Sequence, residues 1–351
     1  EVNTERRYDI DWIRVIAIGL LLIYHTAIGF QPWGVLIGFI TNKEPFESLW
    51  IPMTMINVWR IPILFYVSGM GLFLAMRNRN WKQLFKERFL RIGVPLIFGS
   101  LLIVPLHWFL LQYNYRKGLT YTPGMGHLWF LGNILVYVAI IAPVFLLLRN
   151  RRNKGNENFS GKFWGTPLSL IFVIALFIAE ALLVKPAIYE MYAFSFHGFM
   201  LGMIAFLAGF LFMSNGHFFW KMLVGWTWIP LIIAIALYSL RLWQLPAQAP
   251  VILLVIESNC WIFSLFAFAS KYLNHGSKKL TYLKDAAYPV YILHMVFLYL
   301  GAVLIYPLAI AAPLKFILQL LFTVTGSLLF YEFLIKRINF FRILFGLSKG
   351  K

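Results

Sequence analysis

Ten long apolar runs constrain this chain more than any other feature of its sequence. Runs of about twenty apolar residues can cross a bilayer as helices, and such runs lie near residues 12–31, 53–76, 92–112, 128–148, 167–184, 197–213, 222–240, 250–269, 287–306 and 314–334. The chain is 61% hydrophobic with a mean hydropathy of +0.76, far above what a soluble domain needs. We therefore predict an all-α, multi-pass integral membrane protein with about ten transmembrane helices.

The Lys and Arg residues are distributed unevenly between the two sides of these runs. On the N-terminal side the connections carry 23 of them, and on the opposite side they carry 6. The positive-inside rule then predicts that both termini are cytoplasmic. A net charge of +18 would suggest nucleic acid in a soluble protein. Here the basic residues lie in short connections that set topology, so we expect no nucleic-acid partner.

The connections leave no room for a separate soluble domain. The longest of them, residues 149–165, is a short polar and basic loop, so we expect one transmembrane domain over residues 1–351. The first run is long, follows Arg6 and Arg7 and lacks a small-residue cleavage site, so its helix is expected to stay attached. The single cysteine, Cys260, lies inside an apolar run and excludes a disulfide framework and a Cys-based metal site. We expect no metal.

Arg14 and His25 lie eleven residues apart on the first run. At about 100° per residue, eleven steps return to within roughly 20° of the starting direction, with a rise of roughly 16 Å. Ionisable groups inside spans are costly and by default mark a functional site. One helix face would thus carry a cation near the surface and a titratable ring deep inside. This arrangement suggests an elongated anionic substrate whose reactive end is carried into the bilayer.

Depth along the predicted helices places three further residues in the layer of His25: Arg60, Glu180 and Glu257. A histidine whose pKa lies near neutrality can take a proton from a hydroxyl and return it to a leaving group. A carboxylate can orient such a ring. The alternative for each carboxylate is a pairing that fixes helix packing. For His25 the alternative is an interhelical hydrogen bond.

Other candidates lie nearer the membrane surfaces. Counting from residue 287 places His294 too shallow to share the layer of His25, so we expect it to line the same passage. His127 and Trp129 lie at the outer mouth, where they would contact an external acceptor or form an interfacial aromatic cluster. Arg88 and Arg91, neighbours on one helical face, suit phosphate. Their alternative is a role in topology and contact with anionic lipid.

Together these residues resemble the acyltransferase 3 family of integral membrane acyltransferases, particularly the branch that includes the osmoregulated periplasmic glucan succinyltransferase. The resemblance extends from residue 9 to 294 and rests on Asp11-Trp12-Ile13-Arg14, the Arg14 to His25 spacing, Trp59-Arg60-Ile61-Pro62, Phe65-Tyr66-Val67-Ser68-Gly69, the Arg88/Arg91 pair leading to Pro95, His127-Leu128-Trp129-Phe130-Leu131 and Tyr291-Ile292-Leu293-His294.

The resemblance implies an enzyme of the bacterial inner membrane that moves an acyl group from cytoplasmic acyl-coenzyme A to a hydroxyl of an extracytoplasmic glycan. Acyl-coenzyme A would be the donor substrate, and no tightly bound cofactor is expected. Arg14 and His25 match the family's essential pair, and Arg88 with Arg91 match its cytoplasmic arginine pair. With the interpretation of the residues above, this gives three groups of roles: catalysis, donor binding and acceptor binding. The catalytic group is His25, Arg14, Glu257 and Arg60. Arg14, Arg88, Arg91 and His294 would bind the donor, and His127, Trp129 and Glu180 the acceptor.

Two rival functions share these residues. A proton-coupled exporter of a glycan or small molecule would also use a buried histidine, arginine and carboxylates. A non-catalytic scaffold has no use for the shared face of Arg14 and His25. Acetyl and succinyl both suit the donor, and the acceptor alternatives are a periplasmic glucan, a surface polysaccharide, a lipid-linked sugar or a small molecule.

Overall fold

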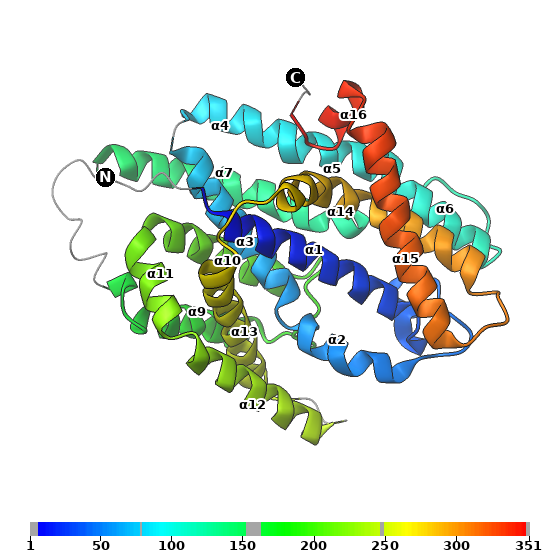
Figure 1. The fold of residues 1–351 in the computed structure, drawn as a ribbon, viewed down its shortest axis with the longest axis horizontal. Coiled ribbons are helices and arrows are strands. Elements are labelled where there is room, and N and C mark those ends of the chain that lie inside the picture. The colour runs from blue at the N-terminus through cyan, green and yellow to red at the C-terminus, as the bar shows by residue number, and fades with distance from the viewer. Residues whose placement is uncertain (1–5, 78, 152–162, 246–248, 349–351) are drawn as a thin grey trace. The chain divides into compact units, whose positions relative to one another are not determined.

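A computed structural model describes residues 6–77, 79–151, 163–245 and 249–348, and the regular elements in these ranges are helices (Figure 1). The α-helices are α1 (Tyr8–Ile28), α2 (Trp50–Asn57), α3 (Arg60–Met76), α4 (Trp81–Arg88), α5 (Val94–Phe98), α6 (Val104–Asn114), α7 (Trp129–Arg151), α9 (Leu168–Val184), α10 (Phe196–Ser214), α11 (Gly216–Gly225), α12 (Trp228–Gln244), α13 (Val251–Tyr272), α14 (Lys278–Ile305), α15 (Ala312–Phe330) and α16 (Asn339–Leu344).

Eight helical segments of the described chain are long and apolar enough to cross a membrane. They are Tyr8–Ile28, Glu47–Met76, Trp81–Asn114, Gly126–Leu146, Phe196–Ser214, Val251–Tyr272, Lys278–Ile305 and Ala312–Ile335. The bent pair α11 and α12 makes a ninth if it is one span, and α9 is a shorter apolar helix. These segments correspond to the ten predicted runs. The prediction of an all-α integral membrane protein is confirmed, whereas the side on which the termini lie stays a prediction.

Helix α15 shows why this fold suits a lipid environment. The residues that it buries include Lys315, Gln319, Thr323 and Ser327, which follow one another at intervals of four. Leucines on the same helix are instead exposed, for example Leu321 at 55%. In water this arrangement would be inverted, because apolar side chains are driven inward. In the hydrocarbon core of a bilayer, exposed apolar side chains carry no such cost, and the polar stripe is the face that packs against other helices.

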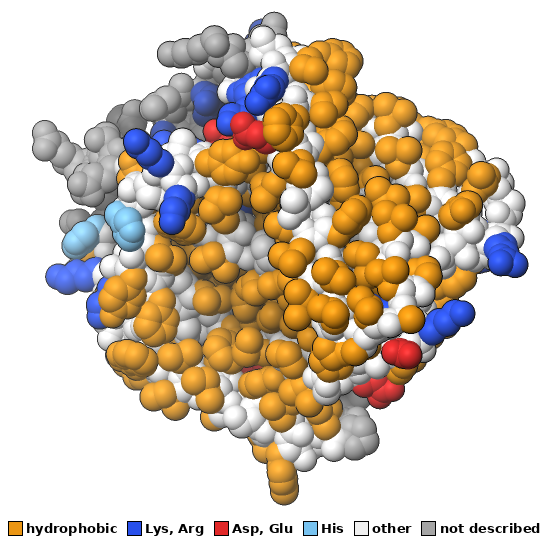
Figure 2. Space-filling model, turned by 45° about the vertical axis from the view of Figure 1, so that its right-hand side comes forward, with side chains coloured by type: hydrophobic (Ala, Val, Ile, Leu, Met, Phe, Trp, Pro, Cys, Tyr) orange, Lys and Arg blue, Asp and Glu red, His pale blue; other side chains and the backbone are white. Residues whose placement is uncertain are grey.

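The surface agrees with this interpretation. On the face shown in Figure 2, hydrophobic side chains cover most of the area, and Lys and Arg side chains lie mainly near its margin. Exposed apolar side chains on this scale are unusual for a soluble protein and typical of a membrane-embedded one.

The chain forms two compact units that alternate along the sequence. The first unit comprises Glu1–Ala17, Asn57–Leu84 and Val136–Leu280, and the second comprises Ile18–Ile56, Phe85–Leu135 and Thr281–Lys351. In the first unit, α3 and α10 touch through glycines. A Cβ on Gly69 would lie 1.8 Å from the Phe206 carbonyl oxygen, and one on Gly209 would lie 2.0 Å from that of Tyr66. Such close backbone contact is how small residues join membrane helices.

The segment Trp81–Asn114 contains two π-helical turns, Phe89–Gly93 and Gly99–Ile103, and both lie in the second unit. Each ends two residues before a proline, Pro95 or Pro105. A proline lacks the N–H of the helical ladder and clashes with the carbonyl four residues earlier, and a wider turn accommodates both. The second turn directly precedes α6, the helix that carries His107.

Candidate functional site

Helix α1 carries both residues of the predicted pair without a break. Arg14 belongs to the first unit, where its Nη1 lies 3.4 Å from Asp11 Oδ1. Gly71 of α3 is adjacent, since a Cβ there would lie 3.8 Å from Arg14 Nη2. The guanidinium side chain is 36% exposed.

His25 belongs to the second unit and contacts His294 of α14. His25 Nδ1 lies 2.8 Å from His294 Nε2, and the two rings are stacked with centroids 5.1 Å apart. His294 is fully buried, and its Nδ1 lies 2.6 Å from the Tyr291 carbonyl oxygen. Because a carbonyl only accepts, His294 Nδ1 carries a hydrogen and donates it.

This contact fixes the tautomers of both rings when they are neutral. With the hydrogen of His294 on Nδ1, its Nε2 is the acceptor, and His25 Nδ1 donates to it. His25 Nε2 is then the unprotonated nitrogen, the one able to take a proton from a substrate. The group that orients His25 here is therefore an imidazole. A part for Glu257 or Glu180 in orienting it stays a prediction.

The shallow position predicted for His294 is wrong. Hydropathy starts its span at residue 287, but α14 begins nine residues earlier, at Lys278. His294 is thus sixteen residues into its helix, and His25 is seventeen residues into α1. At 1.5 Å per residue both lie about 25 Å from their helix starts, which is why the two rings can meet.

Two further histidines of the second unit extend this contact. The ring of His127 lies 5.2 Å from that of His294, and the ring of His107 lies 5.6 Å from that of His127. His127 Nε2 is 3.0 Å from the Ile292 carbonyl oxygen, so it donates there and its Nδ1 is an acceptor. That Nδ1 is buried and has no hydrogen-bond partner among the described residues.

Sequence reasoning made no functional prediction for His107. It is 2% exposed and lies within a predicted span, so the cost of burying an ionisable group was a signal that could have singled it out. Trp129, which is also predicted to contact the acceptor of the acyl group, begins α7 two residues after His127 and is 9% exposed.

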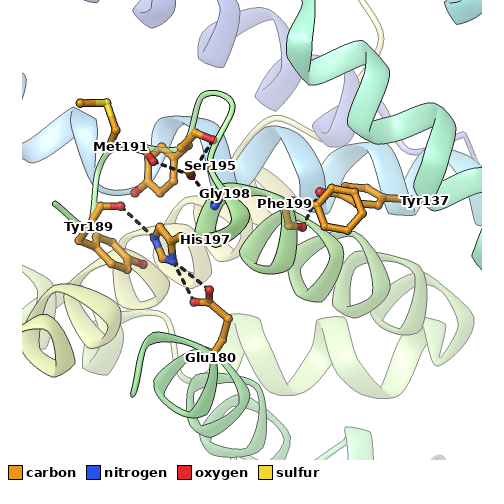
Figure 3. A network of polar contacts seen from close by, with 9 residues as sticks. Tyr137, Glu180, Tyr189, Met191, Ser195, His197, Gly198 and Phe199 are labelled. Carbon is orange, nitrogen blue, oxygen red and sulfur yellow. Dashed lines mark hydrogen bonds and ion pairs between the residues drawn. The ribbon is translucent and has the colours of Figure 1, made fainter. Parts of the chain in front are cut away.

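Glu180 contacts a histidine that sequence reasoning also left out (Figure 3). His197 Nδ1 lies 2.9 Å and 3.1 Å from the two carboxylate oxygens of Glu180, and its Nε2 lies 3.0 Å from the Tyr189 carbonyl oxygen. Both ring nitrogens therefore face oxygen atoms. Burial raises the pKa of the Tyr189 hydroxyl, which therefore stays protonated. This group links α9, α10 and the connection between them.

Glu257 and Arg60 also lie in the first unit. Arg241 of α12 donates to both carboxylate oxygens of Glu257, from Nη2 at 2.7 Å and from Nε at 3.0 Å. Glu190 lies 4.0 Å from Arg241. Arg60, 7% exposed, donates to the Asn57 side chain at 3.2 Å. The catalytic roles of Glu257 and Arg60 stay predictions.

Arg88 and Arg91 share one carboxylate. Each lies 3.3 Å from Glu87, and their side chains are 15% and 57% exposed, respectively. Arg91 is the more accessible of the two for a phosphate group.

Known proteins resemble the chain over nearly its whole length. A family model described as an acyltransferase domain matches residues 7–332. The chain is 25% identical over 372 residues to glucans biosynthesis protein C of Escherichia coli O139:H28 (strain E24377A / ETEC), which covers 94% of this chain and 92% of the relative. The protein of the same name from Escherichia coli O1:K1 / APEC is 25% identical over 370 residues, with the same coverage. No solved structure matches. The chain belongs to the acyltransferase 3 family of integral membrane acyltransferases.

Proposed function

We propose that the protein is an O-acyltransferase of the bacterial inner membrane. It takes an acyl group, acetyl or succinyl, from cytoplasmic acyl-coenzyme A and transfers it to a hydroxyl of an extracytoplasmic glycan. The family supports the acyl chemistry. The relatives named glucans biosynthesis protein C favour a glucan among the possible acceptors.

The contact between His25 and His294 carries this proposal. A general base needs an unprotonated nitrogen and a group that holds its ring. The Tyr291 carbonyl accepts from His294, and His294 accepts from His25. This chain of two hydrogen bonds leaves His25 Nε2 as the base. An orienting partner that is neutral stabilises the charged ring less than a carboxylate would, but it selects the same tautomer.

The reaction proceeds by direct transfer. His25 Nε2 takes the proton of the acceptor hydroxyl. At the same time the hydroxyl oxygen attacks the thioester carbonyl carbon, and this attack forms the new C–O bond. The C–S bond of the tetrahedral intermediate then breaks. His25 returns the proton to the leaving thiolate, which departs as free coenzyme A with its thiol protonated. Arg60 stabilises the oxyanion or binds the acid end of a succinyl group. A route through an acyl group on His25 is the alternative.

Basic residues near the cytoplasmic ends of their helices bind the donor. Arg88 and Arg91 hold phosphates of coenzyme A, since guanidinium groups match phosphate oxygens in a planar, bidentate geometry. Arg14 contributes a third cation. The eleven residue steps along α1 from Arg14 to His25 rise roughly 16 Å, a distance that an extended pantetheine arm can bridge. His294 supports the same site through its hydrogen bond to His25.

The test uses the purified full-length protein in detergent, with radiolabelled acyl-coenzyme A and gluco-oligosaccharides. We expect labelled oligosaccharide from the wild type and a rate about 10²–10⁴-fold lower from His25→Ala. His217→Ala is the matched control, because His217 is exposed in the first unit and should not affect the rate. Acyl transfer by His25→Ala at the wild-type rate would contradict the proposal. Glycan flux into vesicles without any acyl transfer would instead support a proton-coupled exporter.

A further inference from the structure

A series of aromatic rings in the second unit leads to His25. The indole rings of Trp33 and Trp50 have centroids 4.6 Å apart and meet at 79°. Trp50 lies 5.3 Å from Tyr24, and Tyr24 lies 6.0 Å from His25. Each ring therefore contacts the next, from Trp33 to the proposed base.

Accessibility is lowest in the middle of this series, at Tyr24, and His25 at its end is again partly exposed. Trp33 and Trp50 are partly exposed, whereas Tyr24 is 6% exposed. The series thus runs from two partly exposed indole rings, past a buried tyrosine, to a partly exposed histidine. Trp33 lies in the short helical turn Pro32–Ile37, and Trp50 is the first residue of α2.

The chain around Trp33 is tightly fixed to the end of α1. A Cβ on Gly34 would lie 2.5 Å from the Ile28 carbonyl oxygen, so only glycine allows the turn to approach so closely. The Asn42 amide donates to the Gly29 carbonyl at 2.8 Å, and the Phe46 amide donates to that of Phe30 at 2.9 Å. The indole rings are therefore positioned relative to His25 before any ligand binds, which lowers the entropic cost of binding.

We propose that Trp33 and Trp50 form a binding subsite for a pyranose ring of the glycan acceptor. A sugar ring has an apolar C–H face that packs on an aromatic face, and its hydroxyls can accept from an indole N–H. Two rings at nearly a right angle form a corner that contacts the sugar on two sides. The next sugar along the chain presents its hydroxyl to His25. This inference rests on the proposed function.

The chemistry of the series favours the acceptor over the donor. The three aromatic residues carry no charge, whereas the phosphates of coenzyme A require cations. The alternative for the two tryptophans is a structural role, as part of an aromatic belt at the membrane surface. Belt residues anchor a protein by contacting lipid headgroups, and that role does not require ring contacts that continue to the base.

The test measures acyl transfer to glucose and to gluco-oligosaccharides up to the hexasaccharide, using Trp33→Ala, Trp50→Ala and Trp50→Phe. For the oligosaccharides we expect both alanine variants to raise the acceptor KM about fivefold to tenfold, the effect of one aromatic contact. Glucose should show little change, because it needs only the sites next to His25. The KM for acyl-coenzyme A should stay constant, and Trp50→Phe should recover part of the loss.

Trp243→Ala is the matched control, since Trp243 is 83% exposed on α12 in the first unit. Equal effects from Trp243→Ala and Trp50→Ala would overturn the subsite in favour of an aromatic belt. Equal losses for glucose and the hexasaccharide would also overturn it. The proposed function fails separately: it requires His25→Ala to be inactive, whatever the tryptophan variants do. Thermal unfolding of each variant in detergent confirms that a changed KM reflects a folded protein.

Discussion

His25, Glu180 and Glu257 are deep ionisable residues that the sequence singles out, and each contacts a residue of a different helix. That they have partners is predictable, because burying an unpaired ionisable group is costly. Which partners they have is not, because it depends on the rotation and depth of two helices. His197 and Arg241 were therefore missed as partners, although both are ionisable residues in or beside apolar runs.

The pair of Glu180 and His197 gives a stability prediction. Both side chains are buried, at 5% and 3% exposure, so Glu180→Leu leaves the His197 ring without its acceptor. We expect a loss of about 3–5 kcal/mol in unfolding free energy, as for other broken buried pairs. Thermal unfolding in detergent measures it. Combining Glu180→Leu with His197→Phe should recover most of the loss, and a single variant as stable as the wild type would refute the pairing.

Arg91 allows a test of donor binding that leaves the chemistry intact. With 57% of its side chain exposed, Arg91→Ala should fold normally. We expect a KM for acyl-coenzyme A about tenfold higher, with kcat nearly constant, because the lost contact is uniform binding. The effect should shrink as salt rises. A kcat that falls while KM stays constant would place Arg91 outside the donor site.

Among the elements, the apolar runs predict where helices lie better than where they begin. Hydropathy finds the centre of α14 but not its start at Lys278, because its first turns are polar. That error of nine residues removed His294 from the layer of His25. The π-helical turns before Pro95 and Pro105 are likewise absent from a periodicity analysis, although the prolines themselves indicate a departure from regular geometry.

Among the contacts between helices, the one between α3 and α10 can be disrupted by a single added methyl group. Gly69→Ala would place a methyl group 1.8 Å from the Phe206 carbonyl oxygen, so the two helices must separate. We expect a loss of about 1–3 kcal/mol, the usual cost of overpacking. Gly19→Ala on α1 is the control, because a Cβ there would lie more than 4 Å from any packed neighbour outside the local backbone of its own helix, and it should be neutral or slightly stabilising. Equal unfolding midpoints for the two variants would show that α3 and α10 do not touch in this way.

For the whole molecule, composition and run length were enough to predict an all-α membrane protein, because crossing a bilayer leaves few solutions. The division into two units that alternate along the chain was not predicted, since nothing in hydropathy distinguishes one apolar run from another. The match to the acyltransferase domain extends across segments of both units. The orientation in the membrane rests on the Lys and Arg distribution alone.

Cysteine labelling tests that orientation. The native Cys260 is 3% exposed, so it should give little background. Lys43→Cys and Arg337→Cys both introduce a thiol at an exposed position. A membrane-impermeant maleimide added to intact cells should label residue 43, and it should label residue 337 only after the membrane is opened. The reverse pattern would place the termini outside the cytoplasm and move the donor site with them.

The most direct test of the central claim compares kcat for two substitutions of His294. Glutamine offers a carbonyl oxygen to the His25 Nδ1–H, and leucine offers none. If His294 acts by holding His25 in its basic tautomer, His294→Gln should keep kcat within about tenfold of the wild type, and His294→Leu should lower it about 10²–10³-fold. The donor KM should change little in either. Equal kcat values for the two variants, at any level, would contradict the account.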